Sequence, residues 1–327
     1  MTIKDIAKEA GVSSAAVSRF FNGGSLSEEK KNRISEIVEK NNYVPNQTAQ
    51  TMRTGKSGQI GVIVPKIHSD SLTQIMKGIA QSIEKWDYTL ILGCTDFKQE
   101  KEVGYIESMQ RNGIEGIILM GTVMTPYLAS SIKNCKIPIV VTGQNFESVP
   151  CVYNDDKNAL YKLTQIMLKK RKHLAYIGVT EEDLAAGKAR RMGVEKAWDE
   201  AGFDNDKLIK RISEFSMEGG YEVMKSILES GNKVDGVICA TDNIAHGAIQ
   251  AIKEAGKKVP RDISVAGVGN NWTDIISEPQ LTTVQLFYEE CGITACKILK
   301  EMMDSDDNKH VISRVMLGYE IIERGSI

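Results

Sequence analysis

Apolar residues recur with a helical period at the start of the chain. The first stripe has four residues at spacing i, i+3, i+4 and i+7, namely Ile3, Ile6, Ala7 and Ala10. This spacing predicts a short helix, which Gly11 ends because glycine adopts positive φ at no steric cost. Ser13 is a favoured N-cap type, and a second stripe follows it at Val17, Phe20 and Phe21. Two short helices joined by a glycine turn predict a helix-turn-helix, whose second helix enters the DNA major groove.

A third helix is expected after the glycine-containing loop at residues 22–24. Ser27 occupies its predicted N-cap. Its apolar stripe comprises Ile34, Ile37 and Val38. Beyond it the apolar content falls, and Pro45 suits the first position of a short helix that extends to about Arg53. A helix of about two turns is unstable alone in water, so residues 46–58 are expected to form a hinge that folds only when paired or bound to DNA.

From residue 60 onward the pattern changes to short apolar runs that alternate with amphipathic stretches. The apolar runs cover residues 60–64, 89–92, 116–120, 137–141, 174–178, 235–239 and 263–267. The amphipathic stretches cover residues 72–85, 99–112, 159–170, 189–201, 219–229 and 244–255. Continuous apolar strands covered by helices predict parallel sheets. About nine such units exceed one ordinary sheet, so we expect two doubly wound lobes with a ligand cleft at the carboxyl ends of their strands.

Composition and charge agree with a small basic module on a larger regulatory body. Of the 327 residues, 42% are apolar and 26% are charged, which is ordinary for a globular protein. The net charge is −2 for the whole chain. Residues 1–57 hold nine Lys and Arg against six Asp and Glu, a net charge of +3. A basic first segment on an acidic remainder indicates nucleic-acid binding by that segment alone.

Several function classes lack support in the sequence. No apolar run reaches about 18 residues, and the N-terminus lacks a signal-peptide core, so a cytoplasmic protein without a membrane segment is expected. The six cysteines form no C-x-x-C pair, and the four histidines lie far apart, so neither a metal nor another cofactor is expected. No phosphate-binding glycine loop follows a strand, and no catalytic carboxylate pair or Ser-His-Asp set stands out. We therefore expect no enzyme activity; the alternative is a cytoplasmic sugar-binding enzyme with a helical head.

Three segments carry a family resemblance. They are Asp5-Ile6-Ala7…Gly11-Val12-Ser13…Val17-Ser18-Arg19…Asn22, the joint Tyr43-Val44-Pro45-Asn46…Ala49, and the strand Gly61-Val62-Ile63-Val64-Pro65. Later motifs at residues 242–247 and 279–284 agree with them. With these motifs the chain resembles the LacI/GalR family of bacterial transcription regulators along nearly its whole length. Within that family it most resembles the trehalose-operon and sucrose-operon repressor branches.

The resemblance implies an all-α helix-turn-helix head followed by a periplasmic-binding-protein-like α/β core of two lobes with parallel, doubly wound sheets. The implied domains are a DNA-binding head at residues 1–45, a hinge helix or linker at 46–58, and an effector-binding, dimerising core at 59–327. Within the core, lobe one is expected at about 60–159 plus 287–317, and lobe two at about 160–285 plus 318–327.

The outward face of the second helix and the family's hinge provide the candidate DNA contacts. Arg19 is expected to donate two hydrogen bonds to guanine O6 and N7; its alternative role is a phosphate clamp. The family's apolar wedge, which enters a central minor-groove step, falls on Met52, whose alternative is burial between two hinge helices. Thr2 and Ser13 are also candidates for helix caps. The predicted DNA-binding residues are Thr2, Ser13, Ser14, Ala15, Ser18, Arg19, Asn22, Asn46, Ala49, Met52 and Arg53.

Strand-end residues and family positions provide the candidate effector contacts. Arg190 matches the family's Arg-x-x-Gly position, which bonds effector oxygens. Asn270 stands where many members carry an acid, and this amide together with Lys188 and Arg190 fits an anionic ligand. Phe215 suits the core as well as a stacking role, and Asp242 suits a helix cap as well as a ligand contact. The predicted effector-binding residues are Ser69, Ser71, Gly121, Thr122, Gln144, Asn145, Arg190, Phe215, Thr241, Asp242 and Asn270.

The sequence therefore predicts a transcriptional regulator, most simply a repressor of a carbohydrate-utilisation operon. Its expected partners are a pseudo-palindromic operator, read by a homodimer, and a small sugar or sugar phosphate, with a disaccharide or its phosphate favoured. A dimer is expected because the family's tetramer-forming tail does not follow the last strand. Effector-driven lobe closure is expected to change the spacing of the two hinges in the dimer. One alternative is a regulator whose core binds a phosphocarrier protein instead of a sugar.

Overall fold

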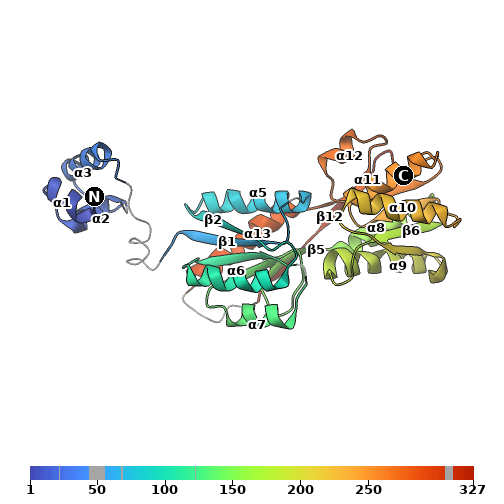
Figure 1. Ribbon diagram of the computed structural model, residues 1–327, viewed down its shortest axis with the longest axis horizontal. Coiled ribbons are helices and arrows are strands. Elements are labelled where there is room, and N and C mark those ends of the chain that lie inside the picture. The colour runs from blue at the N-terminus through green and yellow to red at the C-terminus, as the bar shows by residue number, and fades with distance from the viewer. Residues whose placement is uncertain (22, 44–55, 68, 122, 306–311) are drawn as a thin grey trace. The chain divides into compact units, whose positions relative to one another are not determined.

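The chain forms two separate compact units. The computed structural model describes residues 1–21, 23–43, 56–67, 69–121, 123–305 and 312–327. One unit comprises Met1–Ser57 and the other comprises Gly58–Ile327. In its described part the first unit is built from helices, whereas the second combines helices with two sheets (Figure 1).

The first unit folds as the predicted helix-turn-helix with a third helix. Its described helices are α1 (Ile3–Glu9), α2 (Ser14–Phe21) and α3 (Glu28–Lys40). Ile6, Val17 and Ile34, one from each helix, are fully buried and form the centre of a small core. Gly11 has a φ of 64° between α1 and α2, a conformation that most other residues adopt only with strain. The helix-turn-helix prediction is therefore confirmed.

Side-chain caps hold the start of the first two helices. Thr2 Oγ1 accepts a hydrogen bond from the Asp5 amide at 3.3 Å, and Asp5 Oδ2 accepts one from the Thr2 amide at 2.8 Å. This reciprocal pair is a capping box. Ser13 Oγ accepts from the Ala16 amide at 3.2 Å, as expected of a cap. Ser27 stands at the N-cap of α3, as predicted, although its side chain makes no capping hydrogen bond there.

Lobe one of the second unit is built on a six-stranded parallel sheet. Its strands are β1 (Gln59–Val64), β2 (Thr89–Cys94), β3 (Gly116–Met120), β4 (Ile139–Thr142), β5 (Cys151–Asn154) and β11 (Arg314–Leu317). They lie in the order β11-β5-β4-β3-β1-β2, and every pair in this order is parallel. The strands are short and almost wholly apolar, because helices cover both faces of the sheet.

Helices pack against lobe one in two layers. The helices are α5 (Asp70–Glu84), α6 (Gln99–Arg111), α7 (Pro126–Asn134) and α13 (Tyr288–Asp304). α5 packs against α13, and α6 packs against α7, with α5 and α6 on opposite sides of the sheet (Figure 1). Alternate residues of β1 serve the two layers: Val62 and Val64 join the core cluster under α5 and α13, and Ile63 joins the cluster under α6.

Lobe two repeats this architecture with one reversed strand. Its strands are β6 (Leu174–Gly178), β7 (Ile209–Ile212), β8 (Gly236–Cys239), β9 (Ser264–Val268), β10 (Thr282–Leu286) and β12 (Tyr319–Ile322). They lie in the order β12-β10-β9-β8-β6-β7, parallel except that β12 runs antiparallel to β10. The sheets are parallel as predicted, except for the antiparallel edge strand β12.

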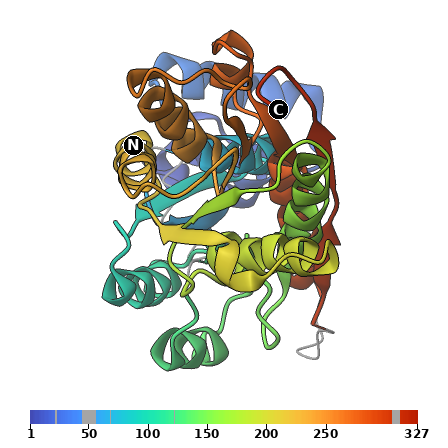
Figure 2. The ribbon, with the colours of Figure 1, turned by 90° about the vertical axis from the view of Figure 1, so that its right-hand side faces the viewer.

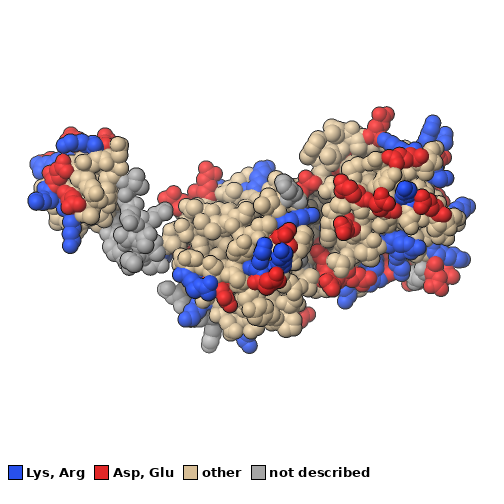
Figure 3. All heavy atoms as spheres, in the orientation of Figure 1, with Lys and Arg blue, Asp and Glu red and all other residues tan. Residues whose placement is uncertain are grey.

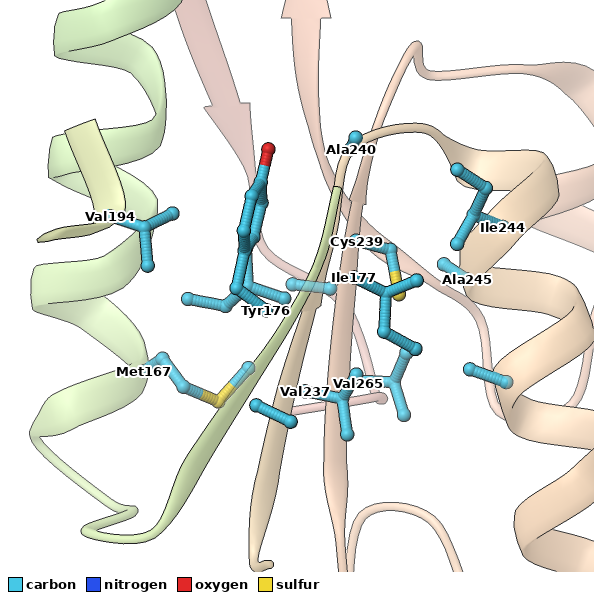
Figure 4. Close-up of a cluster of buried hydrophobic side chains, with 14 of the residues drawn as sticks. Met167, Tyr176, Ile177, Val194, Val237, Cys239, Ala240, Ile244, Ala245 and Val265 are labelled. Atoms are coloured by element: carbon cyan, nitrogen blue, oxygen red, sulfur yellow. The ribbon is translucent and has the colours of Figure 1, made fainter. Parts of the chain in front are cut away.

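The core of lobe two lies between its sheet and two helix pairs. The remaining helices are α8 (Asp156–Leu168), α9 (Arg190–Glu200), α10 (Met217–Glu229), α11 (Asp242–Glu254) and the short α12 (Trp272–Ile276). A π-helical turn, η1 (Leu184–Ala189), precedes α9, and a 3₁₀ turn, η2 (Asn205–Lys207), precedes β7. Figure 2 shows these helices arranged around the sheet, and Figure 4 shows Ile177, Val237 and Val265 packed together on neighbouring strands.

The chain passes between the lobes at three places. The end of β5 in lobe one leads directly into α8, which packs on α9 in lobe two. The end of β10 in lobe two leads into α13, which packs on lobe one. Finally, only Gly318 separates β11 of lobe one from β12 of lobe two. The two lobes are therefore joined by three short chain segments that cross close together.

The two-lobed α/β architecture confirms the predicted fold class. The predicted apolar runs correspond to β1, β2, β3, β4, β6, β8 and β9. The edge strand β7 has no apolar run to predict it, because Lys210 and Arg211 lie at its centre and its side chains are largely exposed. Within the described residues, no helix is both long and apolar enough to cross a membrane.

Candidate DNA-binding and ligand-binding sites

The second helix presents its predicted DNA-binding face to the surface. Ser14, Ala15 and Arg19 are exposed, whereas Val17 on the opposite face is buried. Arg19 Nε donates to the Ala15 carbonyl oxygen at 3.4 Å, which directs the side chain along α2. Ser18 is partly buried. Basic and acidic side chains are intermingled on the visible surface of this unit (Figure 3). Positive charge therefore does not cover this surface uniformly, and the predicted contacts of α2 with DNA are confined to one of its faces.

Other predicted DNA contacts have structural roles or lie outside the described residues. Thr2 and Ser13 cap α1 and α2, which gives both hydroxyls a structural function in the absence of DNA. The residues of the predicted set outside the described ranges are Asn22, Asn46, Ala49, Met52 and Arg53. The DNA-contact assignments therefore remain predictions.

A cavity of about 190 Å³ lies where the strand ends of the two lobes face each other. It is lined by residues of lobe one and lobe two, as expected for two facing doubly wound sheets. Seven of the predicted effector residues line it: Ser69, Ser71, Gly121, Gln144, Arg190, Phe215 and Thr241. The residues predicted from their position at strand ends and those predicted from the family resemblance thus meet at the same cavity. The contacts of a bound effector remain predictions.

Arg190 is buried and joined to several elements. Its Nε donates to Asp156 Oδ1 at 2.7 Å, and its Nη2 donates to the Tyr288 hydroxyl at 3.5 Å. Its Nη1 also donates to the Ala240 carbonyl oxygen. Arg190 thus ties α9 to the starts of α8 and α13 and to the end of β8. Burial raises the pKa of the Asp156 carboxyl, and the neighbouring guanidinium opposes that shift.

Gln144 connects the two lobes through its carboxamide. Its Nε2 donates to Asp183 Oδ1 at 2.8 Å, and its Oε1 accepts from the Ala185 amide at 3.1 Å. Gln144 follows β4 in lobe one, whereas Asp183 caps η1 in lobe two. The side chain is only 3% exposed. These two bonds can form only when the lobes are close together, so they favour the closed arrangement.

Lys66 stands at the rim of the cavity beside two aromatic rings. Its Nζ lies 5.9 Å from the ring centroid of Phe97 in lobe one and 5.6 Å from that of Phe215 in lobe two. Both distances are within cation–π range. Burial lowers the pKa of Lys66, and the Asp70 carboxylate opposes this shift. The ring of Phe215 thus contributes to the cavity wall and also packs against the core of lobe two.

Three predicted effector residues lie outside the cavity wall, and Thr122 lies outside the described residues. Asn145 is exposed. Asn270 adopts a φ of 52°, and its amide donates to Gln285 Oε1 and accepts from Arg324 Nη2, both at 2.5 Å. Its side chain is therefore committed to lobe two. Lys188 is exposed and also lies outside the wall, so only Arg190 of the three residues behind the expected anionic ligand lines the cavity, and that expectation stays a prediction.

Asp242 is buried behind the cavity rather than in its wall. Its Oδ1 accepts from Thr283 Oγ1 at 2.6 Å, and the side chain is fully buried. Burial and the nearby Asp274 carboxylate raise the pKa of Asp242 well above its usual range. Asp274 in turn contacts His246 Nε2 at 2.7 Å. The cap of α11 is Thr241, whose hydroxyl accepts from the Ile244 amide at 3.3 Å, so neither predicted role of Asp242 is observed.

Sequence reasoning missed several polar residues of the cavity wall. They are Lys66, Asp70, Thr142, Asn154, Asp156, Asp183, Asn243, Asn271 and Tyr288. Thr142 and Asn154 are the last residues of β4 and β5. Their position at the carboxyl end of a strand is therefore a sequence signal for a place in the cavity wall. Asp183 and Tyr288 reach the cavity through the packing of η1 and α13, for which the local sequence carries no signal. Within the described residues, no cluster of His, Cys, Asp or Glu suits a metal ion.

Comparisons with known proteins agree with this organisation. Residues 2–46 match the family model of bacterial regulatory proteins of the lacI family. Residues 57–319 match the model of periplasmic binding proteins and the sugar binding domain of the LacI family. The division between these two matches agrees with the separation of the helical unit from the α/β unit.

Individual relatives match nearly the whole chain. The HTH-type transcriptional regulator RegA of Clostridium saccharobutylicum is 30% identical over 99% of this chain and 98% of that protein. The sucrose operon repressor of Staphylococcus xylosus is 30% identical over 92% of this chain and 93% of that protein. A crystal structure of the lac repressor dimer, bound to operator and the anti-inducer ONPF, matches the fold with a TM-score of 0.90 at 20% identity, covering 100% of this chain and 98% of that one. The chain belongs to the LacI family of bacterial DNA-binding transcriptional regulators, with the family's sugar-binding core.

Proposed function

We propose that this protein is a repressor of a carbohydrate-utilisation operon, controlled by a small sugar that binds between the two lobes. The observation that carries the proposal is the inter-lobe cavity at the strand ends, with the Gln144 carboxamide bonded across it. Planar amides, carboxylates and hydroxyls surround this cavity together with the Phe215 ring. Such a combination suits a polyhydroxylated ligand with one apolar face. The 30% identity to a sucrose operon repressor supports the same assignment.

The proposed DNA reader is α2, acting in a homodimer on a pseudo-palindromic operator. Arg19 is the proposed guanine reader, and Ser14 and Ala15 are its small neighbours on the exposed face. The proposed hinge at residues 46–58, with Met52 as the wedge, joins each reader to its core. A sugar that changes the angle between the lobes changes the spacing of the two hinges, and so the affinity for the operator.

The proposal is tested with the purified full chain. A thermal-shift screen of sugars and sugar phosphates is expected to find a ligand that raises the midpoint, because binding to the folded state stabilises it. Gel shifts on an operator selected from random DNA are then expected to show a change in operator affinity of about tenfold or more with that ligand. Conversion of a sugar to product, or no shift across the screen, would contradict the proposal.

Two asparagine variants provide a matched comparison for this screen. Asn243 lines the cavity, whereas Asn145 is exposed and lies outside the wall. Asn243→Ala is expected to weaken sugar binding about five- to tenfold through the loss of one hydrogen-bonding group. Asn145→Ala is expected to leave sugar binding unchanged. Equal effects of the two substitutions would place the sugar elsewhere.

A further inference from the structure

The polar side chains of the cavity carry more acid than base. Among its described lining residues, three are carboxylates, Asp70, Asp156 and Asp183, and two are cations, Lys66 and Arg190. Arg190 is paired with Asp156 at 2.7 Å. The Lys66 ammonium group is attracted by the Asp70 carboxylate, and it lies over the rings of two aromatic residues. Asp183 thus contributes a negative charge to the wall that neither of these cations pairs with.

Asp183 is held in one orientation by three donors. Its Oδ1 accepts from Gln144 Nε2 at 2.8 Å and from the amides of Ala185 and Ala186 at 3.0 and 2.9 Å. All three bonds converge on the same oxygen atom. Among the described residues no hydrogen bond to Oδ2 is formed, and the side chain is partly exposed at the cavity. The fixed Oδ2 is therefore available to accept from a ligand.

Two further side chains of the wall have unpartnered polar atoms. Thr142 is fully buried and Asn154 is 6% exposed, and both line the cavity. Thr142 Oγ1 and Asn154 Oδ1 have no hydrogen-bond partner in the described part of the chain. A buried polar atom without a partner destabilises the fold, because it has lost its hydrogen bonds to water. A ligand that donates hydrogen bonds to these atoms removes that penalty.

We infer that the cavity selects an uncharged, hydroxyl-rich sugar over its phosphorylated form, and that Asp183 is a specificity-determining residue for this choice. The inference rests on the proposed sugar-controlled function. Sugar hydroxyls both donate and accept, so they satisfy the Asp183 and Asn154 oxygens. A phosphate group carries about −1.5 to −2 charges at neutral pH and has mainly acceptor oxygens. In this cavity it would face fixed carboxylates without an unmatched arginine to bind it.

Isothermal titration of the full chain with matched pairs tests the inference. The pairs are glucose and glucose 6-phosphate, sucrose and sucrose 6-phosphate, and trehalose and trehalose 6-phosphate, at pH 7.5. For the pair that binds, the neutral member is expected to bind at least about tenfold more tightly. Equal or tighter binding of the phosphorylated member overturns the inference and leaves the proposed function standing. No binding by any of these sugars, and none in the wider screen above, overturns both.

Substitution of Asp183 tests its role. Asp183→Asn removes the charge but retains an oxygen for the helix cap, and is expected to reduce the preference for the neutral sugar about fivefold or more. Asp199→Asn makes the same chemical change at an exposed position of α9 outside the wall, and is expected to leave the preference unchanged. Asp70→Asn serves as a second cavity variant if Asp183→Asn fails to fold. An unchanged preference in a folded cavity variant overturns the role of carboxylate charge in the selection.

Discussion

At the scale of single residues, burial changes the chemistry of one carboxyl group in lobe one, that of Glu102. Glu102 on α6 is only 3% exposed, and its Oε2 has no hydrogen-bond partner in the described part of the chain. Burial raises its pKa to about 7. Since the folded protein then holds the proton more tightly than the unfolded chain does, stability falls as the pH rises from the unfolded pKa toward about 7.

Glu102→Gln is expected to remove this pH dependence. At pH 4 the variant and the wild type should have similar stabilities, because the wild-type carboxyl is then largely protonated in both the folded and the unfolded chain. At pH 8 the variant should be more stable by about 1–3 kcal/mol. Urea denaturation at both pH values measures the difference, with the exposed Glu107→Gln on the same helix as control. A variant that is no more stable at pH 8 would show that Glu102 ionises without loss of stability.

Arg19 is the residue for which the sequence makes the sharpest DNA prediction. Arg19→Ala is expected to weaken operator binding by about 1–3 kcal/mol and to relax the preference at one base position in each half-site. A gel-shift panel of single-base operator variants measures both effects. Arg33→Ala, at an exposed position of α3, is the control and should leave base preference intact. A uniform loss with Arg19→Ala on every sequence would instead assign it to a phosphate.

At the scale of elements, helix pairs in both lobes approach each other through glycines. In lobe one a Cβ added at Gly78 would stand 2.1 Å from the Glu289 carbonyl oxygen, and one at Gly292 would stand 2.2 Å from that of Ile75. In lobe two Gly220 and Gly247 have the same relation across α10 and α11, at 2.3 and 1.9 Å. Such distances leave no room for any larger residue without a shift of the backbone.

Gly292→Ala is therefore expected to destabilise the core by about 1–3 kcal/mol, because α5 and α13 must separate to accommodate the methyl group. Gly104→Ala on α6 is the matched control, since nothing lies within 4 Å of an added Cβ there. That substitution should be neutral or stabilising by up to about 1 kcal/mol, because alanine favours helix. Thermal melts of both variants measure the contrast; similar melting points would show that the α5–α13 contact relaxes easily.

Sequence patterns predicted the described helices of the first unit, the helices of the second unit other than α7, α12 and α13, and most central strands, because burial of one face leaves a regular apolar spacing. The patterns predicted strands less well where a strand is stabilised mainly by pairing with its neighbour in the sheet. The short β7 carries charged side chains at a sheet edge, and β12 pairs in the opposite direction to its neighbour. In the site, Ser69, Gly121 and Thr241 were found because they follow or border strands, whereas Asp183 and Tyr288 depend on tertiary packing. Asn270 lies outside the wall because its side chain accepts a hydrogen bond from Arg324, which lies 54 residues farther along the chain.

At the scale of the whole core, the closed arrangement of the lobes is stabilised by a few specific contacts. Gln144 supplies two hydrogen bonds across the cavity, and Lys66 of lobe one lies over the Phe215 ring of lobe two. Contacts of this kind are present in the closed state and absent in an open one, so they shift the equilibrium between the two. A ligand adds its own contacts to both lobes and shifts it further.

Gln144→Ala is expected to weaken sugar binding about 5- to 150-fold, the combined effect of two hydrogen bonds of about 0.5–1.5 kcal/mol each. Calorimetry measures the affinity, and small-angle scattering of the ligand-free variant should show a larger radius of gyration than the wild type. Asn145→Ala, at the neighbouring exposed position, should change neither quantity. An unchanged radius together with weaker binding would mean that Gln144 acts only as a ligand contact.

The three crossings between the lobes have a consequence for recombining this regulator with its relatives. Neither lobe is a continuous stretch of chain, because α13 and β11 return to lobe one after lobe two has been built, and β12 then returns to lobe two. A hybrid that exchanges one lobe needs matched junctions near Asn154, Phe287 and Gly318 at once. A hybrid that exchanges the helical unit needs one junction, between Ser57 and Gly58. A single recombination event can therefore exchange the helical unit and, with it, the operator preference. The two lobes that form the sugar site are instead inherited together, because separating them needs three junctions at once.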